Sequence, residues 1–428
     1  MSTLSAPVTK LLLQRYKDIR NQTVKICEPL EPEDTVVQPI VDVSPPKWHM
    51  AHTSWFFETF VLTPYLPGYK LFHPQYSYLF NSYYKALGSR VQRLQRSTLT
   101  RPPLRDMYAY RSHIDTHVEK LLHQLPVAKI VELQPVLELG LQHEQQHQEF
   151  LITDIKYILS TNPLLPVYQP LPTQQRNKDG NAKATYLEVP GGLYTIGYTG
   201  NDFCFDNELG VHEVLIEDFE VMSRLVTNRE YLEFMHDGGY KDFRHWLDEG
   251  FAMVNTEKLE APLYWVQQDK EWYRFTMHGL QKVDMNEPVC HISFYEADAY
   301  ANWAGKRLLT EFEWEAVSQV YPPHGGNFQS SGLLEPVAAD PAVEGMQQLY
   351  GDVWEWTYSA YHPYPGFSKA PGAIGEYNGK FMINQMVLRG GSCATPQNHI
   401  RTTYRNFFHP DKRWQYNGIR LANRKNNG

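Results

Sequence analysis

The chain has 428 residues, of which 42% are hydrophobic and 21% charged, and a formal net charge of −8. This length predicts two or three folded domains, and the acidic balance argues against a nucleic-acid partner, which usually demands a basic surface. No apolar run is long enough to predict a membrane span or a signal peptide, and the four cysteines lie far apart without a CxxC pair. We therefore expect a folded cytoplasmic protein with no nucleic-acid or membrane partner and no disulfide framework.

The first 161 residues are predicted to be mostly helical. In segments 115–126 and 128–160, apolar residues recur at intervals of three and four, which is the period of an amphipathic helix. A further helix is expected to begin at Pro45 and Pro46, because proline is favoured in the first turn of a helix. We therefore expect residues 1–161 to form a helical domain.

The composition changes after this helical segment. Residues 162–185 are rich in proline, glutamine, asparagine and glycine and lack periodicity, so a linker is predicted. Residues 186–428 contain short strand-like pieces and many turn residues. Two helices are expected there, at 228–240 and at 293–307, the second with Ser293 as its N-cap. The sequence thus predicts a helical domain joined to an irregular α+β domain.

Two histidines, His143 and His147, lie four residues apart within the predicted helix. Side chains at this spacing share one face of a helix, and the face is otherwise apolar, so both imidazoles could bind one metal ion. Together with Glu144 they fit the H-E-x-x-H motif of zinc proteases, in which the glutamate is the general base. The third histidine that extends this motif in one group of proteases is missing, which disfavours that function. Two hydrogen-bonded core histidines are the alternative without a metal.

His52 is predicted to supply a third imidazole from the preceding helix. It shares an inward stripe with Trp48 and Trp55, whereas the alternative ligand, His49, lies one turn away and nearer the flank. Three neutral imidazoles leave part of a metal's coordination sphere open. Such a site suits iron that takes up O2 and a substrate together, and it also suits catalytic zinc, so the spacing alone does not choose between the metals.

Several long motifs, in one consistent order, resemble a known enzyme family. The segments "KWHMAHTSWFFE", "LFNSYYKALG" and "HEQQHQEFLITDI" resemble the DinB-like helical domain of the EgtB-type sulfoxide synthases of ergothioneine biosynthesis. The segments "GDVWEWT" and "RGGSCATP" resemble the formylglycine-generating-enzyme-like domain of the same enzymes. The resemblance implies an α+β multidomain fold. A DinB-like four-helix bundle would span residues 1–161, followed by the linker at 162–185 and an irregular C-type-lectin-like domain at 186–428.

The resemblance also implies a reaction. Enzymes of this family use non-haem Fe(II) and O2 to join a cysteine thiol to C2 of the imidazole of hercynine, a trimethylhistidine, and they oxygenate the sulfur. In this chain His52, His143 and His147 would hold the iron. The thiolate, O2 and the hercynine imidazole would then share the open positions.

Residues for proton transfer and substrate binding follow from the same resemblance. Tyr361, the first tyrosine of a Y-x-P-Y stretch, would donate a proton to the oxygen intermediate. Tyr83 and Tyr84 form a competing pair, because some members of the family use a pair in the helical domain instead. A quaternary ammonium cannot accept hydrogen bonds and calls for aromatic faces and polar oxygens. The expected substrate contacts are Tyr364, Asn406, Phe407 and Gln146.

The sulfur donor depends on a further difference within the family. Relatives that accept γ-glutamylcysteine hold its carboxylates with two arginines of the helical domain and an aspartate. Arg90, Arg93 and Arg96 are the candidate arginines here, but Phe408 stands where the aspartate would be needed. Cysteine is therefore favoured, with γ-glutamylcysteine as the alternative. A DinB-type metal-dependent thiol transferase and a non-catalytic binding protein are the other functions that stay open.

Overall fold

The computed structural model describes residues 5–172, 182–322, 325–371, 375 and 377–424. They divide into two compact units, one reaching to Tyr168 and the other made of Gln169–Pro371 and the described residues from Tyr377 onward. Part of the predicted linker, residues 173–181, lies outside the described residues. No helix in the described part of the chain combines the length and the apolar character needed to cross a membrane.

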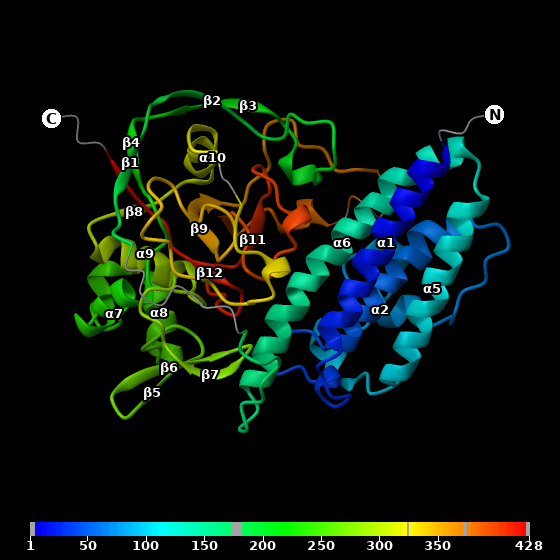
Figure 1. Cartoon of the computed structure of the whole chain (residues 1–428), viewed down its shortest axis with the longest axis horizontal. Helices are drawn as coiled ribbons and strands as arrows, with labels where there is room; N and C mark the ends of the chain where they lie inside the picture. The colour runs from blue at the N-terminus through cyan, green and yellow to red at the C-terminus, as the bar shows by residue number, and fades with distance from the viewer. Residues whose placement is uncertain (1–4, 173–181, 323–324, 372–374, 376, 425–428) are drawn as a thin grey trace. The chain divides into compact units, whose positions relative to one another are not determined.

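Long helices form the first unit (Figure 1). Their bounds are Ser5–Cys27 (α1), Pro46–Phe57 (α2), Leu104–Gln124 (α5) and Val127–Ser160 (α6). A π-helical turn, Glu58–Leu62, continues α2 and is followed by the short helices Thr63–Tyr65 (α3) and Tyr76–Phe80 (α4). Helix α1 packs against α6, and α2 packs against both α5 and α6. The predicted helical character of this part of the chain is thus confirmed.

A buried aromatic core holds α2 in place. Every residue of α2 is buried, and Trp55, Phe56 and Phe57 pack in one core with Tyr110 of α5. Helix α6 approaches α2 closely at Gly140, where an added Cβ would lie 2.6 Å from a ring carbon of Phe57. Glycine inside a helix costs roughly 1 kcal/mol relative to alanine. Here its lack of a side chain permits the contact that brings the two helices together.

The second unit contains two four-stranded sheets, a hairpin and a three-stranded meander (Figure 1). In sheet order, the first sheet is Tyr186–Val189 (β1), Phe219–Met222 (β4), Leu421–Arg424 (β13) and Arg307–Leu308 (β8). The second is Asn406–Phe408 (β11), Met386–Arg389 (β10), Trp354–Ala360 (β9) and Asn417–Gly418 (β12). The hairpin is Gly192–Ile196 (β2) and His212–Ile216 (β3), and the meander is Trp265–Gln268 (β5), Glu271–Thr276 (β6) and Gly279–Lys282 (β7). Neighbouring strands are antiparallel except β12, which runs parallel to β9.

Four α-helices are described in this unit, and three of them begin at a capping box. Their bounds are Asn228–His236 (α7), Asp248–Glu257 (α8), Phe294–Trp303 (α9) and Glu311–Val320 (α10). The predicted cap is confirmed, because the Ser293 hydroxyl accepts a hydrogen bond from the backbone N–H of Glu296. Helices α7 and α9 end earlier than predicted, at His236 and Trp303, since a glycine with positive φ follows two residues after each.

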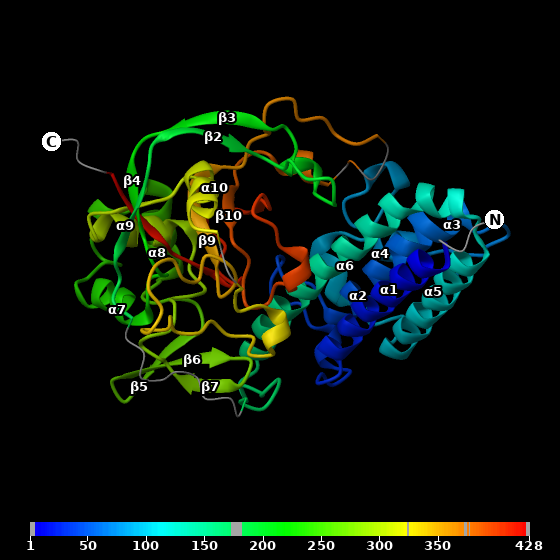
Figure 2. The same ribbon diagram turned by 45° about the horizontal axis from the view of Figure 1, so that its top comes forward.

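Buried polar contacts tie α10 to the second sheet, beside which it lies in Figure 2. The indole N–H of Trp314 donates to Glu355 of β9 at 2.9 Å, and the same carboxylate pairs with Arg420 at 2.9 Å. Glu315 of α10 pairs with Arg389 of β10. These contacts fix β9, whose end leads directly into Tyr361.

Candidate metal centre

Three histidines from two helices of the first unit converge. His52 lies on α2, and His143 and His147 lie one turn apart on α6. All three are buried, and their candidate ligand nitrogens lie within 4.8 Å of one another. Within the part of the chain that the structure describes, this is the one group of histidine, cysteine or acidic side chains found close enough to share a metal ion.

The imidazole of His52 is oriented by its own helix and by a backbone carbonyl. Its ring stacks on Trp48 and on Trp55, with centroid separations of 4.6 and 5.4 Å and interplanar angles of 13° and 15°. Its Nδ1 lies 2.5 Å from the carbonyl oxygen of Phe80. Because a carbonyl oxygen only accepts, Nδ1 carries the hydrogen, and the lone pair of Nε2 is left for a metal.

His147 is contacted by a second histidine. Its Nδ1 lies 2.8 Å from Nδ1 of His49, whose Nε2 lies 3.0 Å from Oδ2 of Asp154. The same oxygen accepts the backbone N–H of Ser44 at 2.8 Å. His49 is buried, as is every residue of α2. The contact of Asp154 with His49 was not predicted from the sequence. An aspartate seven residues after His147 falls on the same inward face of the helix, and this spacing could have indicated it.

The cluster fits a divalent metal ion. Burial lowers the pKa of His143 to about 4, although Glu144 opposes the shift, and Nδ1 of His143 has no hydrogen-bond partner among the described residues. Burial also holds the pKa values of His52 and His147 well below the ordinary value, and neighbouring imidazoles add to the shift. Histidine binds metals through a neutral imidazole, so these three residues have the required form at neutral pH.

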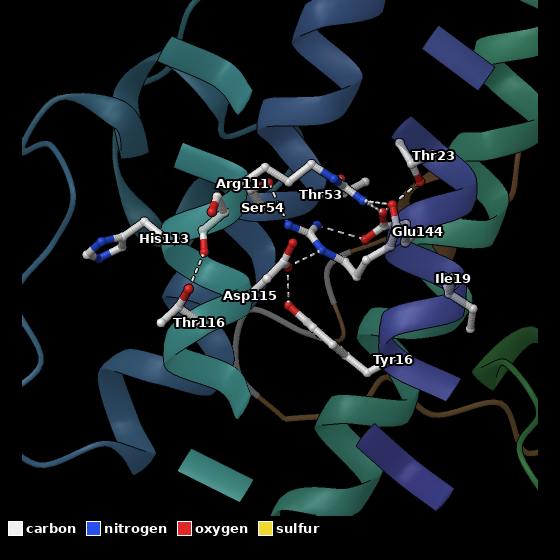
Figure 3. Close-up of polar contacts among 12 residues, drawn as sticks. Tyr16, Ile19, Thr23, Thr53, Ser54, Arg111, His113, Asp115, Thr116 and Glu144 are labelled. Atoms are coloured by element: carbon white, nitrogen blue, oxygen red, sulfur yellow. Dashed lines mark hydrogen bonds and ion pairs between the residues drawn. The ribbon is translucent and has the colours of Figure 1, made fainter. Parts of the chain in front are cut away.

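The carboxylate of Glu144 is held by neighbouring side chains (Figure 3), which argues against its use as a base. Its carboxylate pairs with Arg20 at 2.9 Å and with Arg111, and it accepts the Thr23 hydroxyl at 2.6 Å. Burial raises the pKa of Glu144, but Arg111 and Arg20 outweigh burial and lower it to about 2. A carboxylate with both oxygens bound to cations is a structural ion pair. The zinc-protease function that the motif suggested is therefore unsupported.

One of the three predicted arginines, Arg96, lies against Trp48 of α2. Arg96 is buried, with its guanidinium carbon 3.4 Å from the ring centroid of Trp48 and its Nη1 donating to Ser44 at 2.8 Å. Burial lowers the pKa of Arg96 to about 9, and the nearby charge of Arg93 adds to this shift. Arg90 is partly exposed. Of the three candidates, Arg96 thus lies beside an aromatic ring that contacts a histidine of the cluster.

The two candidate proton donors of the first unit, Tyr83 and Tyr84, differ in environment. The hydroxyl of Tyr83 accepts a hydrogen bond from Arg93 at 3.3 Å. Tyr84 is buried, with its ring centroid 5.5 Å from that of Trp55. Gln146, between the two histidines of α6, is partly buried. The ring of Tyr84 therefore lies near Trp55, which stacks on His52, whereas the hydroxyl of Tyr83 contacts Arg93.

Tyr361 lies in the second unit. Its ring stacks on Phe407 with centroids 4.1 Å apart and planes at 11°, and its hydroxyl accepts a hydrogen bond from Asn207 at 2.9 Å. Burial raises the pKa of Tyr361 above its ordinary value, so the phenol stays protonated at neutral pH. Asn406, which precedes Phe407 on β11, is partly exposed.

Tyr364 is committed to a buried ion pair. Its hydroxyl donates to Glu311 at 3.0 Å, and Glu311 pairs with Arg405 at 2.8 Å. The guanidinium carbon of Arg405 lies 3.8 Å from the centroid of the Tyr364 ring. The residues predicted from the sequence thus fall into two groups, one in each unit, and the convergent histidines belong to the first.

The second unit also matches a described domain family. Residues 171–425 match the sulfatase-modifying factor enzyme 1-like domain, called FGE-sulfatase. This match covers more than half of the chain, so the chain carries this domain. The predicted formylglycine-generating-enzyme-like character of the second half is thereby confirmed.

Relatives extend the similarity over both units. A hercynine oxygenase of Mycolicibacterium smegmatis is 33% identical, and the similarity covers 89% of this chain and 91% of the relative. A hercynine oxygenase of Mycolicibacterium thermoresistibile is 31% identical, and the similarity covers 99% of this chain and 96% of the relative. Ergothioneine biosynthesis protein 1 of Schizosaccharomyces pombe is 26% identical and covers 60% of this chain and 32% of its own length. The chain therefore belongs to the hercynine oxygenase family and is an oxygenase enzyme of ergothioneine biosynthesis.

Proposed function

We propose that the chain joins a cysteine thiol to C2 of the hercynine imidazole and oxygenates the sulfur, with O2 as the oxidant. One oxygen atom ends on sulfur as the sulfoxide. The other leaves as water with the hydrogen atoms of C2–H and S–H, so the four electrons that O2 accepts are balanced. The convergence of His52, His143 and His147 is the observation that carries this proposal.

Fe(II) is the proposed metal, held by these three imidazoles. When bound, iron would activate O2 and bind the thiolate. The chain contributes neutral ligands, because burial keeps the histidines unprotonated, and it fixes the ring of His52 through Trp48 and Trp55. The charged pairing of Glu144 with Arg20 and Arg111 disfavours zinc-dependent hydrolysis, in which such a glutamate would act as base.

Tyr361 is the proposed proton donor. A general acid must hold its proton until the reaction needs it, and burial keeps this phenol protonated. Phe407 holds the ring and Asn207 holds the hydroxyl, so the donor is positioned within its own unit. Tyr84 is the alternative, supported by its contact with Trp55.

Aromatic and amide groups are proposed to bind hercynine. Phe407 and Asn406 offer an aromatic face and a polar oxygen for the trimethylammonium group. Tyr364 is less available, because Arg405 covers its ring and Glu311 takes its hydroxyl. Gln146 would bond the imidazole or the carboxylate from its place between the two histidines of α6.

Cysteine is the proposed sulfur donor. The aromatic ring of Phe408 packs against Trp414, with centroids 5.7 Å apart, at the position where a γ-glutamyl amine would need an acid. The alternative, γ-glutamylcysteine, would depend on Arg90, Arg93 and Arg96. Of these, Arg96 already donates to Ser44 and stacks on Trp48.

Anaerobic purification followed by metal analysis and O2 uptake tests the proposal. We expect iron, and O2 consumption that requires both hercynine and a thiol. Bound zinc with thiol transfer in the absence of O2 would support the DinB-type transferase instead. A metal-free protein that binds a ligand without turnover would support the binding protein.

A further inference from the structure

A chain of hydrogen bonds passes from α6 to α2 and back to α6. It begins at Asp154 of α6, continues through His49 of α2 and ends at His147 of α6. All three side chains are buried. The backbone N–H of Ser44 donates to the same Asp154 oxygen that contacts His49, which fixes the position of this carboxylate.

The chemistry of the three groups fixes the direction of these hydrogen bonds. An ionised carboxylate only accepts, so Nε2 of His49 carries a hydrogen and donates to Asp154. A neutral imidazole has one donor and one acceptor, so Nδ1 of His49 accepts. The contact at 2.8 Å then requires Nδ1 of His147 to donate. The lone pair of His147 that remains is on Nε2.

From this geometry we infer that His49 and Asp154 are positioning residues for the metal, which set the tautomer and the ring orientation of His147. The inference rests on the proposed metal site and extends it. Partners of this kind raise the basicity of a metal-bound histidine and hold its ring, and their loss typically weakens metal binding 10–100-fold. His49 itself is not a ligand, because both of its ring nitrogens are engaged.

The three proposed ligands therefore differ in the hydrogen-bond partner of the ring nitrogen that does not face the metal. His52 donates to a neutral carbonyl, and Nδ1 of His143 has no partner among the described residues. His147 is the histidine connected to a carboxylate, through His49. We expect His147 to be the strongest donor of the three, and His49 to be the residue through which the negative charge of Asp154 acts.

Metal affinity of the full-length protein tests this role without turnover. The probes are Fe(II) and Zn(II), each titrated anaerobically into metal-free protein against a competing chelator. His49→Phe keeps a ring and removes both nitrogens, and Asp154→Asn keeps the shape and removes the charge. Thr153→Val is the matched control. It is buried beside Asp154 on α6, and its hydroxyl donates only to the carbonyl of Phe150.

We expect His49→Phe to weaken the binding of both metals 10–100-fold and Asp154→Asn to weaken it less. Thr153→Val should stay within about twofold of the wild type, and His147→Phe should lose more affinity than His49→Phe. A wild-type Kd in His49→Phe overturns the inference, and so does a loss as large as that of His147→Phe, which would make His49 a ligand. If His49→Phe does not fold, a wild-type Kd in Asp154→Asn overturns it.

A second measurement reports the tautomer directly. In the zinc-bound protein labelled with ¹⁵N-histidine, His147 should show a protonated Nδ1 and a metal-bound Nε2. The reverse pattern contradicts the inference. Both measurements are made without hercynine or O2, so they can fail while the proposed reaction stands, and they can succeed even if the substrate is a different one.

Discussion

At the scale of single residues, the orientation of each imidazole depends on neighbours close in the chain. Trp48 and Trp55 stack on His52 from four residues before it and three residues after it, the spacings that share one face of a helix. Ligands held by packing and hydrogen bonds reach a metal with little loss of conformational freedom. The aromatic residues of α2 thus orient the ring of His52 and also form part of the buried core.

Tyr361→Phe tests the proposed proton donor. This change keeps the ring that stacks on Phe407 and removes only the hydroxyl that contacts Asn207. We expect sulfoxide formation to fall by about a hundredfold, a typical cost of losing a general acid, while cysteine dioxygenation rises. Product analysis by mass spectrometry measures both. A nearly silent Tyr361→Phe, with Tyr83→Phe or Tyr84→Phe changing the products, would move this role to the first unit.

The proposed preference for cysteine is a second property that we expect to depend on a single residue. Because Phe408 occupies the place of an acid, we expect kcat/KM for cysteine to exceed that for γ-glutamylcysteine by at least about tenfold, roughly 1.4 kcal/mol of transition-state discrimination. Steady-state kinetics with each thiol at saturating hercynine measures the ratio. Equal efficiencies would show that the arginines at 90–96 recognise the glutamyl arm.

We expect the buried carboxyl of Asp352 to make the stability of the second unit depend on pH. Burial raises its pKa to about 7, above the value of roughly 3.9 expected in the unfolded chain. Between these values the folded protein binds more protons than the unfolded one, so this residue's contribution to stability falls as pH rises. Asp352→Asn cannot titrate, and it retains an acceptor for Asn327 and for the backbone N–H of Val337.

We therefore expect Asp352→Asn to be more stable than the wild type at pH 8, by at least about 1 kcal/mol, with a smaller difference at pH 5. Denaturant unfolding at the two pH values measures this. Asp202→Asn, at an exposed aspartate, is the control and should show no such trend. A stability difference that does not grow with pH would contradict the assignment.

At the scale of elements, the contact between α2 and α6 decides whether the histidines meet. Gly140 lies three residues before His143, and the rings of Phe56 and Phe57 occupy the space that a side chain there would need. Both rings are fully buried and cannot move into solvent. A larger residue would therefore separate the two helices that carry the cluster.

Gly140→Val is expected to destabilise the protein by about 1–3 kcal/mol, since overpacking forces buried side chains to shift. It should also weaken metal binding, although no ligand is changed. Thermal unfolding and metal titration measure the two effects. The control is Val131→Ala on the exposed face of the same helix, where 63% of the valine is accessible and little change is expected. Full metal affinity in Gly140→Val would show that the approach of the helices is not needed.

Parts of helices α2 and α6 could be predicted from the sequence. The apolar period of α6 and the prolines before α2 placed His52, His143 and His147 on inward faces, because helical periodicity is local. The partners of Glu144 could not be predicted, since Arg20 and Arg111 come from helices far away in the chain. The pairing of β13 with β4 and β8 could not be predicted either, because these strands are far apart in the chain. A strand as short as Arg307–Leu308 could not be predicted, because two residues are too few to show the alternation of a strand.

At the scale of the whole molecule, the relatives cover both units, whereas the domain match begins at residue 171. The first unit supplies the convergent histidines, and the second supplies the buried tyrosine proposed as the acid. The motifs that resembled the family were found in both halves of the sequence, which is why the family could be predicted. The hydrogen bonds of His49 depend on the packing of α2 against α6, and a sequence motif does not reveal them.

The origin of the sulfoxide oxygen distinguishes the proposed oxygenation from the other reactions. The anaerobically purified chain, loaded with Fe(II), is given hercynine, cysteine and ¹⁸O2, and the product is analysed by mass spectrometry. We expect a hercynine–cysteine sulfoxide that contains one ¹⁸O atom, and no such product from His143→Ala, because two imidazoles hold Fe(II) weakly. A product without ¹⁸O, or undiminished synthesis by His143→Ala, would contradict this proposal.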